Sequence, residues 1–370
     1  MKVLHVISGG ETGGSKNHIL SLLQGLPKKE VMLCVFQEGL LYEQAKQLGI
    51  EVKILKQISR YDLSILTRFK KLIRENQIEI VHSHGARANL YCYFVSYFKQ
   101  SFKWITTVHS DPRDDFIRGG IKGKVFTSIN MHILKKINYF FAVSERFKQM
   151  LCEFGIKEEK IETIYNGIDF KKKFPAKLER SDIGLSDEDF VIIMVARLHP
   201  IKGHTEVFKA LQKLVLKNRK VKLLLVGDGP IKDQLVEDVT SMNLEKNVEF
   251  LGFQSDVHSY FCLADIKILA SYSESFPLVL LEAARANTPI ISTDVGGVKN
   301  LINSEELGWV IPVKNIDSIE QALNEALEKK NKHLLDGMGK KLHDRAKEEF
   351  SIEKLVNQTY LHYKKILNGK

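Results

Sequence analysis

The sequence has few prolines and cysteines and no long hydrophobic run. Its 370 residues include 8 Pro and 4 Cys. No apolar run reaches the roughly 18 residues that a transmembrane helix needs. The N-terminus has no basic and apolar segments of the signal-peptide kind. We therefore expect a globular cytoplasmic protein that does not cross a membrane.

The sequence also lacks the spacings of common metal sites. Its cysteines are too far apart for a zinc site or a dense disulfide framework, at Cys34, Cys92, Cys152 and Cys262. Isolated cysteines of this kind are typical free thiols in a reducing cytoplasm. The histidines have no HExxH spacing, and the acidic run 187–189 is typical of a solvated turn. The sequence thus predicts no metal and no cofactor.

Basic residues are concentrated in the first half of the chain. Residues 1–180 have 30 Lys and Arg against 18 Asp and Glu, a net +12, whereas residues 181–370 have 25 against 27. This asymmetry favours an anionic partner for the first half. Nucleic acid is disfavoured, because the basic residues are scattered, are not interleaved with aromatic residues and match no known binding module.

Short apolar runs alternate with amphipathic helical patterns from end to end. The runs occur at 2–7, 31–36, 51–55, 78–83, 104–110, 139–144 and 161–166, and then at 190–196, 221–227, 248–253, 266–271, 289–293 and 309–313. Continuous apolar strands interleaved with helices indicate parallel sheets covered on both faces, an α/β fold. The chain is long for one domain, so two domains are expected.

A charged segment without clear periodicity separates the two series of strands. We expect a first domain over residues 1–170, a linker over 171–189 and a second domain over 190–350. The last helical pattern, 351–368, is followed by no strand, and we expect it to cross back onto the first domain.

Two carboxylates stand out in the apolar segment 270–297. Glu274 lies in a small polar loop after a strand, and Glu282 lies inside a helical pattern. A buried carboxylate without a partner is costly, so each needs an explanation. An ion pair with Arg285 would explain Glu282 and solvation would explain Glu274, whereas ligand hydroxyls would explain both.

The helix that carries Glu282 is predicted over residues 277–287. Ser275 fits its N-cap, and Pro277 fits its first turn, where the missing N–H costs nothing.

Polar loops follow several strands in both halves. The loop after the first strand has glycines at 9, 10, 13 and 14, in neither the GxGxxG nor the P-loop spacing. Arg197 and Lys202 follow one strand of the second half, where two fixed cations beside a helix start would suit a diphosphate. Solvated charges are the simpler alternative.

Histidines end two strands of the first half. They are His82, His84 and His109, and each could bind a hydroxyl or a phosphate or merely fill a turn.

Together these motifs resemble the retaining glycosyltransferases of family 4. In the order of that family, the sequence has YNGID at 165–169, ARLHPIKG at 196–203, VGDGP at 226–230, SESFPLVLLEA at 273–283 and TDVGG at 293–297. The first half matches more loosely, through the glycine-rich loop, His109 and AVSE at 142–145. The resemblance implies the GT-B fold, two Rossmann-like domains whose parallel sheets face an interdomain cleft.

The resemblance also implies roles for single residues. Glu274 would contact the donor sugar and Glu282 the nucleotide ribose. Arg197 and Lys202 would neutralise the leaving diphosphate, and His109 would lie beside the donor sugar; with Glu274, these form the expected catalytic set. The other residues expected at the donor are Gly13, Gly14, Gly227, Phe253, Ser275, Phe276, Pro277, Leu278 and Val279. Ser275 departs from the glycine of many relatives.

The implied reaction is transfer of a sugar, expected from a UDP-sugar, to an acceptor hydroxyl with retention of configuration. Charge stabilisation of the leaving diphosphate is the main requirement, and this fold meets it without a metal. A nucleotide-sugar epimerase on the same fold is an alternative. A nicotinamide-dependent oxidoreductase is disfavoured, because its glycine fingerprint is missing.

The acceptor is expected on the first domain, as in this family. Four lysines lie near aromatic residues there: they are Lys122, Lys124, Lys135 and Lys136, beside Phe126, Tyr139, Phe140 and Phe141. This arrangement favours contact with an anionic membrane and a lipid-linked glycan acceptor of surface polysaccharide synthesis. A soluble small-molecule acceptor is the alternative.

Overall fold

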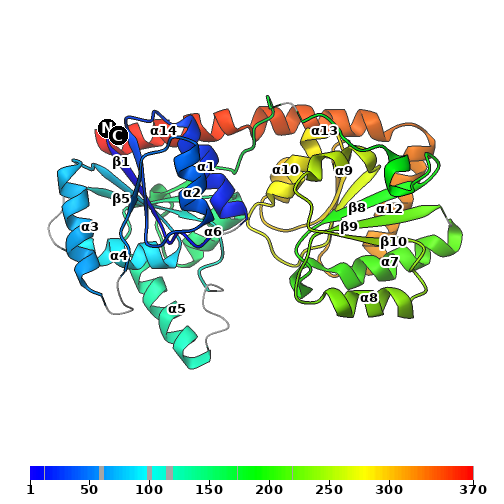
Figure 1. Ribbon diagram of the computed structural model, residues 1–370, viewed down its shortest axis with the longest axis horizontal. Helices are drawn as coiled ribbons and strands as arrows, with labels where there is room; N and C mark the ends of the chain where they lie inside the picture. The colour runs from blue at the N-terminus through cyan, green and yellow to red at the C-terminus, as the bar shows by residue number, and fades with distance from the viewer. Residues whose placement is uncertain are drawn as a thin grey trace. The chain divides into compact units, whose positions relative to one another are not determined.

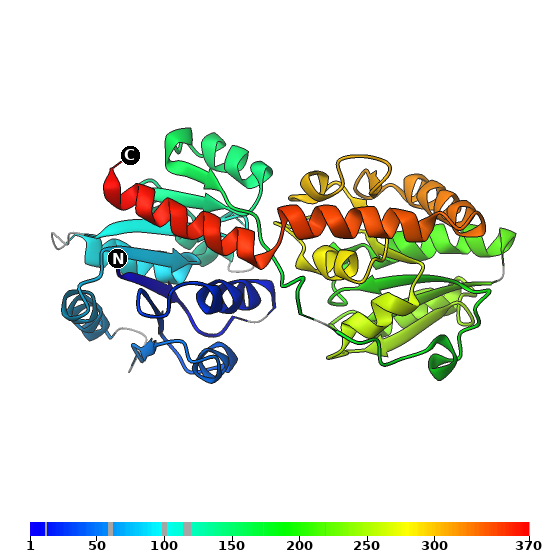
Figure 2. The same cartoon turned by 90° about the horizontal axis from the view of Figure 1, so that it is seen from above.

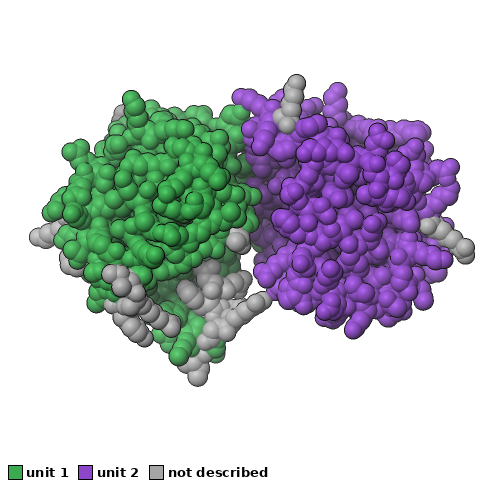
Figure 3. Space-filling view, in the orientation of Figure 1, with its two compact units in different colours: residues 1–167, 352–370 green, residues 168–351 purple. Residues whose placement is uncertain are grey.

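Two parallel sheets, each with helices on both faces, form the framework of the described chain (Figure 1). They belong to two compact units: unit 1 comprises residues 1–167 and 352–370, and unit 2 comprises residues 168–351 (Figure 3). The structure is a computed structural model and describes residues 1–11, 13–57, 62–97, 102–113, 120–172, 174–218 and 220–369. The α/β fold expected from the alternating apolar runs is confirmed.

The sheet of unit 1 has the strand order β3-β2-β1-β4-β5-β6-β7. Its strands are β1 (Val3–Ile7), β2 (Val31–Val35), β3 (Val52–Ile54), β4 (Ile80–His84), β5 (Lys103–Val108), β6 (Tyr139–Ala142) and β7 (Ile161–Thr163). Its helices are α1 (Gly14–Gly25), α2 (Leu40–Gln47), α3 (Ser64–Glu75), α4 (Ala86–Ser96), α5 (Gly120–Leu134), α6 (Glu145–Glu153) and α14 (Ile352–Asn368).

The sheet of unit 2 has the strand order β10-β9-β8-β11-β12-β13. Its strands are β8 (Phe190–Val195), β9 (Val221–Val226), β10 (Val248–Gly252), β11 (Ile266–Leu269), β12 (Ile290–Thr293) and β13 (Gly308–Ile311). Its helices are α7 (His204–Lys217), α8 (Lys232–Ser241), α9 (Val257–Leu263), α10 (Leu278–Arg285), α11 (Val298–Leu301), α12 (Ile316–Asn331) and α13 (Leu335–Glu349). Strands buried on both faces explain the nearly continuous apolar runs.

Each sheet has a point where the strand order reverses. It lies between β1 and β4 in unit 1 and between β8 and β11 in unit 2. Open parallel sheets bind ligands beyond the carboxyl ends of their strands at such points. The glycine-rich loop follows β1, and the loops with Arg197 and Glu274 follow β8 and β11. The topology therefore brings the glycine-rich loop to the reversal point of unit 1, and Arg197 and Glu274 to that of unit 2.

The last helix, α14, is part of unit 1, and Figure 2 shows it lying along that unit. Leu355, Tyr363 and Ile366 on α14 are buried with Ile19 of α1 in the same core. α1 and α14 pack closely, since a Cβ added at Gly25 would lie 2.5 Å from Val356 Cγ2. The predicted helix over 351–368 thus contributes to the unit formed by the first residues of the chain.

The segment predicted as a linker, 171–189, lies within unit 2. Its charges have partners there: Arg180 pairs with Asp265 at 3.1 Å, and its guanidinium also donates to the carbonyl of Asp189. A short 3-10 helix, Arg180–Ile183, follows the extended stretch. The segment has little helical or strand periodicity because side-chain contacts, rather than a long element, hold it on the unit.

No helix in the described residues is both long and apolar enough to cross a membrane.

Candidate active site

The loops at the carboxyl edge of the unit 2 sheet interlock through their backbones. A Cβ at Gly203 would lie 2.2 Å from the carbonyl oxygen of Ala270, and one at Gly227 would lie 2.0 Å from that of Ala196. Gly227 also donates its N–H to the carbonyl of Gly252 at 2.8 Å. Glycine is therefore required where the loops after β8, β9, β10 and β11 touch. Gly227, predicted at the donor nucleotide, supports the neighbouring loops in this way.

Lys202 and Glu274 form an ion pair at this edge. Lys202 lies at the end of the short 3-10 helix Pro200–Lys202, and its Nζ is 2.5 Å from Glu274 Oε1. Ser271 Oγ donates to the same carboxylate oxygen at 2.7 Å. Both ionic side chains are largely but not completely buried. The structure thus brings one of the predicted diphosphate cations together with the predicted sugar-binding carboxylate.

Two other predicted residues at the carboxyl edge of this sheet, Arg197 and Phe253, are exposed. Arg197 has no hydrogen bond or ion pair with any residue that the structure describes, and its side chain is exposed. Phe253, which follows β10, is 81% exposed. An exposed aromatic ring at the carboxyl edge of a parallel sheet can stack on a nucleotide base, and a guanidinium without a protein partner can bind a phosphate.

The start of helix α10 differs from the prediction. The helix begins at Leu278 and its N-cap is Pro277, which makes no side-chain cap hydrogen bond. The prediction of Ser275 as the N-cap is wrong, because the chain stays extended through Pro277, whose φ is −75° and ψ is 102°. Pro277 has no N–H, so the amides of Leu278 and Val279 are the ones that this helix start can offer to an anion.

The side chains around this helix start have structural contacts. Phe276 is buried and its ring lies 5.2 Å from that of Phe350, so only its backbone remains for the predicted role. The carbonyl of Ser275 accepts from the N–H of Gly297 at 3.2 Å. A Cβ at Gly296 would lie 2.1 Å from the same carbonyl oxygen. The TDVGG motif thus supports the loop that carries Glu274.

The carboxylate of Glu282 has no hydrogen bond or ion pair within the described ranges of the chain. Arg285 instead donates to the carbonyl of Asp169 at 3.2 Å and lies 3.9 Å from the ring centre of Phe174. The ordinary surface pair with Arg285 is therefore absent from these residues. Burial raises the pKa of the Glu282 carboxyl, although the positive charges of Arg285 and Lys267 act in the opposite direction. A partly buried carboxylate of this kind is open to a ligand hydroxyl.

Lys267 is a charged residue of this region that sequence reasoning missed. It lies in the middle of β11 and is fully buried, with its Nζ 2.5 Å from the carbonyl oxygen of Ile268. The pKa of Lys267 is lowered to about 7, mainly by burial and also by the charge of Lys202, whereas Glu274 and Glu282 act in the opposite direction. The signal for it in the sequence is a lysine inside the apolar strand IKIL.

In unit 1, the predicted residues gather at the carboxyl ends of β1 and β5. Gly13 is the N-cap of α1 with φ 76° and ψ −140°, and Gly14 is the first residue of that helix. Both are exposed. His109 follows β5, and its ring centre lies 4.9 Å from that of His18 on α1. Burial lowers the pKa of His109 well below its usual value, so the imidazole is neutral at pH 7.

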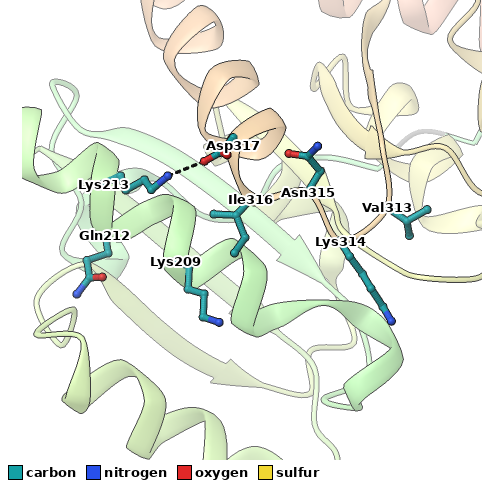
Figure 4. Close-up of a pocket in the computed structure, with 8 residues that line it drawn as sticks. All are labelled: Lys209, Gln212, Lys213, Val313, Lys314, Asn315, Ile316 and Asp317. Atoms are coloured by element: carbon teal, nitrogen blue, oxygen red, sulfur yellow. Dashed lines mark hydrogen bonds and ion pairs between the residues drawn. The ribbon is translucent and has the colours of Figure 1, made fainter.

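Unit 2 also has a surface hollow of about 650 Å³ (Figure 4). It is lined by α7 and by the segment 313–317, and it contains none of the predicted donor residues. Lys213 in this hollow pairs with Asp317 at 2.7 Å and with Glu320 at 3.1 Å. Its charge is compensated, which distinguishes this hollow from the edge that carries Arg197.

Two family models match the chain, each over a different part. "Glycosyltransferase Family 4" matches residues 12–172, and "Glycosyl transferases group 1" matches residues 176–348. Among solved structures, the Anabaena protein HepE in complex with UDP has a TM-score of 0.85 at 20% identity and covers 98% of this chain and 100% of its own. Sucrose-phosphate synthase from Thermosynechococcus elongatus has a TM-score of 0.80 at 18% identity, with 100% of both chains covered.

The two Rossmann-like units and these structural neighbours define a GT-B protein. The family models together account for most of its length, and the chain belongs to glycosyltransferase family 4.

Two curated relatives cover most of the chain. N-acetyl-alpha-D-glucosaminyl L-malate synthase of Bacillus anthracis is 28% identical over 328 residues, which are 84% of this chain and 82% of that protein. UDP-Gal:alpha-D-GlcNAc-diphosphoundecaprenol alpha-1,3-galactosyltransferase of Escherichia coli is 27% identical over 306 residues, 80% of this chain and 78% of that protein. The activity class of this chain is therefore that of a glycosyltransferase.

Proposed function

We propose that this glycosyltransferase moves a sugar from a UDP-sugar to a hydroxyl of a lipid-linked glycan, with retention of configuration. The donor is supported by two names: the E. coli relative uses UDP-Gal, and HepE was solved with UDP. The acceptor is supported by the undecaprenol diphosphate in the name of that relative. The observation that carries the acceptor is an exposed apolar face on unit 1, flanked by lysines.

The proposed donor site is the carboxyl edge of the unit 2 sheet. Departure of UDP leaves negative charge on the diphosphate, and fixed cations that face this charge lower the barrier. Arg197 supplies a cation that has no partner in the described part of the chain, and Lys202 supplies a second cation, held by Glu274. The carboxylate that orients Lys202 is also the one proposed to bind hydroxyls of the transferred sugar. Retention would follow a front-face route in which the leaving phosphate takes the acceptor proton.

The apolar face that supports the acceptor lies on α4 and α5. Five large apolar side chains there are exposed: Phe94 44%, Tyr97 66%, Val125 54%, Phe126 43% and Ile129 41%. Along α5 the positions 122, 125, 126 and 129 share one helix face. The four predicted lysines are exposed around the helix, at Lys122, Lys124, Lys135 and Lys136. An apolar helix face with basic neighbours suits the interface of an anionic membrane.

Part of the aromatic cluster predicted for this surface does not belong to it. Phe140 and Phe141 are 1% and 3% exposed, because they are core residues of β6. That part of the prediction is wrong, since the aromatic run is a central strand. The membrane proposal therefore depends on α4 and α5, with peripheral attachment on the cytoplasmic side.

Vesicle sedimentation tests the membrane part of the proposal. We expect the protein to sediment with anionic vesicles and not with neutral ones at low salt, and we expect V125S/F126S and K122E/K124E to abolish this. Matched controls on unit 2 are L216S, since Leu216 is 84% exposed, and K246E/K332E, which makes the same charge change. Equal partition onto both lipids, or a loss of binding in the controls as large as in the test variants, would refute the membrane surface.

A soluble anionic acceptor is the second candidate. The name of the B. anthracis relative contains L-malate, a small dicarboxylate that would also suit a basic unit. Transfer from UDP-sugars to L-malate, compared with transfer to a polyprenol-diphosphate sugar, separates the two. Transfer to malate without any requirement for lipid would replace the membrane proposal.

We also propose that transfer needs no metal, because Arg197 and Lys202 provide the compensating charge. Activity should survive dialysis against EDTA. Loss of activity that added magnesium or manganese restores would contradict this.

A further inference from the structure

A continuous chain of buried hydrogen bonds leads to His109 from the interior of unit 1. Its first links join Thr107 Oγ1 to His82 Nε2 at 2.7 Å and His82 Nδ1 to Tyr363 OH at 2.6 Å. Tyr363 OH lies 3.1 Å from His5 Nε2, and His5 Nδ1 lies 3.1 Å from His84 Nε2. The last link joins His84 Nδ1 to His109 Nε2 at 3.2 Å.

Strand register explains how the histidines meet. His5 on β1 is the direct partner of His82 on β4, and His84 is the partner of Thr107 on β5. Side chains two residues apart on a strand share a face, so His82 and His84 lie on the same side as His5. This is the face that α14 covers, and Tyr363 of α14 enters the same core. The chain of hydrogen bonds therefore joins three strands to α14, a helix from the other end of the sequence.

These histidines are neutral at pH 7. Burial lowers the pKa of His5 to about 3 and lowers the pKa values of His82 and His84 well below the usual value. A neutral imidazole donates through one ring nitrogen and accepts through the other. Tyr363 has one O–H, so it can donate to His5 or to His82 but not to both. Every hydrogen bond in the chain must consequently run in the same direction.

Thr107 determines that direction. Its hydroxyl is buried, and in the described part of the structure Oγ1 has no hydrogen-bond partner other than His82. A buried O–H without an acceptor is costly, so Thr107 donates to His82 Nε2. His82 then donates to Tyr363, Tyr363 to His5, His5 to His84, and His84 to His109 Nε2. The proton of His109 is left on Nδ1.

A metal ion fits these histidines less well than the hydrogen bonds do. The nitrogens of His5, His82 and His84 lie within 4.8 Å of one another, a spacing that three ligands of one ion could have. However, both nitrogens of each of these rings already face a hydrogen-bond partner. A structural zinc site would also need a fourth ligand.

We propose that Thr107 and Tyr363, acting through this hydrogen-bond chain, hold His109 in the Nδ1-protonated tautomer, so that Nδ1 is the ring nitrogen that can donate to a sugar oxygen of a bound substrate. His109 Nδ1 is the nitrogen of the chain that has no partner among the described residues, and His109 is partly exposed at the end of β5. Tyr363 is a positioning residue in this scheme. The role of His109 at the donor rests on the proposed function, whereas its tautomer does not.

The tautomer can be measured directly in the full-length protein. Long-range proton–nitrogen correlation spectra of histidine-labelled protein distinguish the two tautomers, and a His109→Gln variant assigns the signal. We expect wild-type His109 to carry its proton on Nδ1. In Tyr363→Phe the link is broken, so both tautomers of His109 should be populated. Tyr360→Phe is the matched control: it removes a hydroxyl of the same helix that bonds to Glu30 instead.

Kinetics provide a second readout. Tyr363→Phe should lower kcat by roughly tenfold, the effect of one misdirected hydrogen bond, with little change in the donor KM. If Tyr363→Phe does not fold, Thr107→Val removes the donor at the other end of the chain, and Thr107→Ser should restore the wild-type spectrum. An unchanged His109 tautomer in both Tyr363→Phe and Thr107→Val overturns the inference. A joint shift of the His5, His82 and His84 signals on titration with Zn²⁺ also overturns it, because these histidines would then form a metal site. If the spectra are as expected but the protein does not turn over UDP-sugars, the result counts against the proposed function and not against the tautomer.

Discussion

The two units present their predicted site residues at the same place in the fold but with different electrostatics. At the carboxyl edge of unit 2, Arg197, Lys202 and Glu274 are ionic and at least partly accessible to solvent. At the carboxyl edge of unit 1, the buried His84 and the partly exposed His109 are hydrogen-bonded to each other, and burial lowers the pKa of both. One edge therefore offers fixed charge, and the other offers neutral hydrogen-bonding groups.

The difference shows how one architecture can serve two chemical needs. A leaving diphosphate requires compensating charge, which an exposed guanidinium or an ammonium held by a carboxylate can supply without full desolvation. A sugar oxygen requires only a directed hydrogen bond. A buried imidazole supplies that direction because its protons are fixed by their partners rather than by water.

The largest expected effect of this difference is on acid stability. Below pH 6.5 the unfolded chain binds protons that the buried histidines of unit 1 cannot accept, because their pKa values are lowered, to about 3 for His5 and about 4 for His18. The stability of unit 1 should therefore fall as the pH drops from 6.5 towards 4. In unit 2, His204, with a pKa of about 4, is the one histidine for which a comparably large lowering is resolved in the described residues. Unit 1 should unfold first.

Two tryptophans allow each unit to be followed separately. The sequence has 2 Trp, Trp104 in β5 and Trp309 in β13. Fluorescence of W309F then reports unit 1, and that of W104F reports unit 2, during urea unfolding at a series of pH values. The midpoint of unit 1 should fall more steeply between pH 6.5 and 4. Parallel pH dependence of the two units would show that the buried histidines do not distinguish them.

The next largest effect is expected for Glu274→Gln. The amide keeps the shape of the side chain but removes the charge that faces Lys202 at 2.5 Å. Loss of one such contact in the transition state should lower turnover roughly 100-fold or more, whereas UDP binding should persist. Steady-state kinetics together with calorimetry of UDP binding would measure both. Glu237→Gln on the exposed face of α8 is the control, and near-normal turnover of Glu274→Gln would remove Glu274 from the site.

Glycine substitutions compare the tight and the open loops of the two edges. Gly227 and Gly13 both have positive φ, 142° and 76°. A Cβ at Gly227 would overlap the carbonyl oxygen of Ala196, whereas one at Gly13 would meet nothing within 4 Å. Gly227→Ala should destabilise unit 2 by roughly 3 kcal/mol. Gly13→Ala should destabilise unit 1 by only about 1 kcal/mol, from its φ alone.

Urea unfolding of the single-tryptophan proteins measures both values. Equal destabilisation by the two substitutions would mean that the interlocked loops of unit 2 relax without difficulty, and the contrast between the edges would be lost.

The fold was accessible from the sequence because local patterns determine it. Strands buried on both faces appear as continuous apolar runs, and every predicted run overlaps a strand of one of the two sheets. The unit 2 motifs were also local, since Arg197, Lys202 and Glu274 lie in loops that directly follow strands. Periodicity and loop chemistry were sufficient there.

The buried hydrogen bonds of unit 1 and the start of α10 could not be predicted, because they depend on contacts between distant parts of the sequence. Tyr363 and His5 are 358 residues apart, and no spacing connects them. The sequence predicts His82 and His84 at a strand end, but it does not give their buried partners, which depend on the sheet register. The residue type of Ser275 fits an N-cap, but the loop contacts with Gly296 and Gly297 hold the chain extended beyond it.

The smallest expected effect concerns the exposed cation of unit 2. Arg197 has no partner among the described residues, so Arg197→Ala should leave stability unchanged. One charge-assisted bond to a phosphate contributes about 1.5–3 kcal/mol, so UDP affinity should fall roughly tenfold to a hundredfold. The same substitution should weaken the dependence of binding on salt, because exposed charge is screened. Calorimetry at low and high salt measures both effects, with Lys232→Ala, an exposed cation of α8, as the control.

His109→Gln in unit 1 should leave the salt dependence of UDP binding unchanged, since the imidazole carries no charge at pH 7. Unchanged UDP affinity in Arg197→Ala, or an equal loss of salt dependence in His109→Gln, would remove the electrostatic contrast between the two edges.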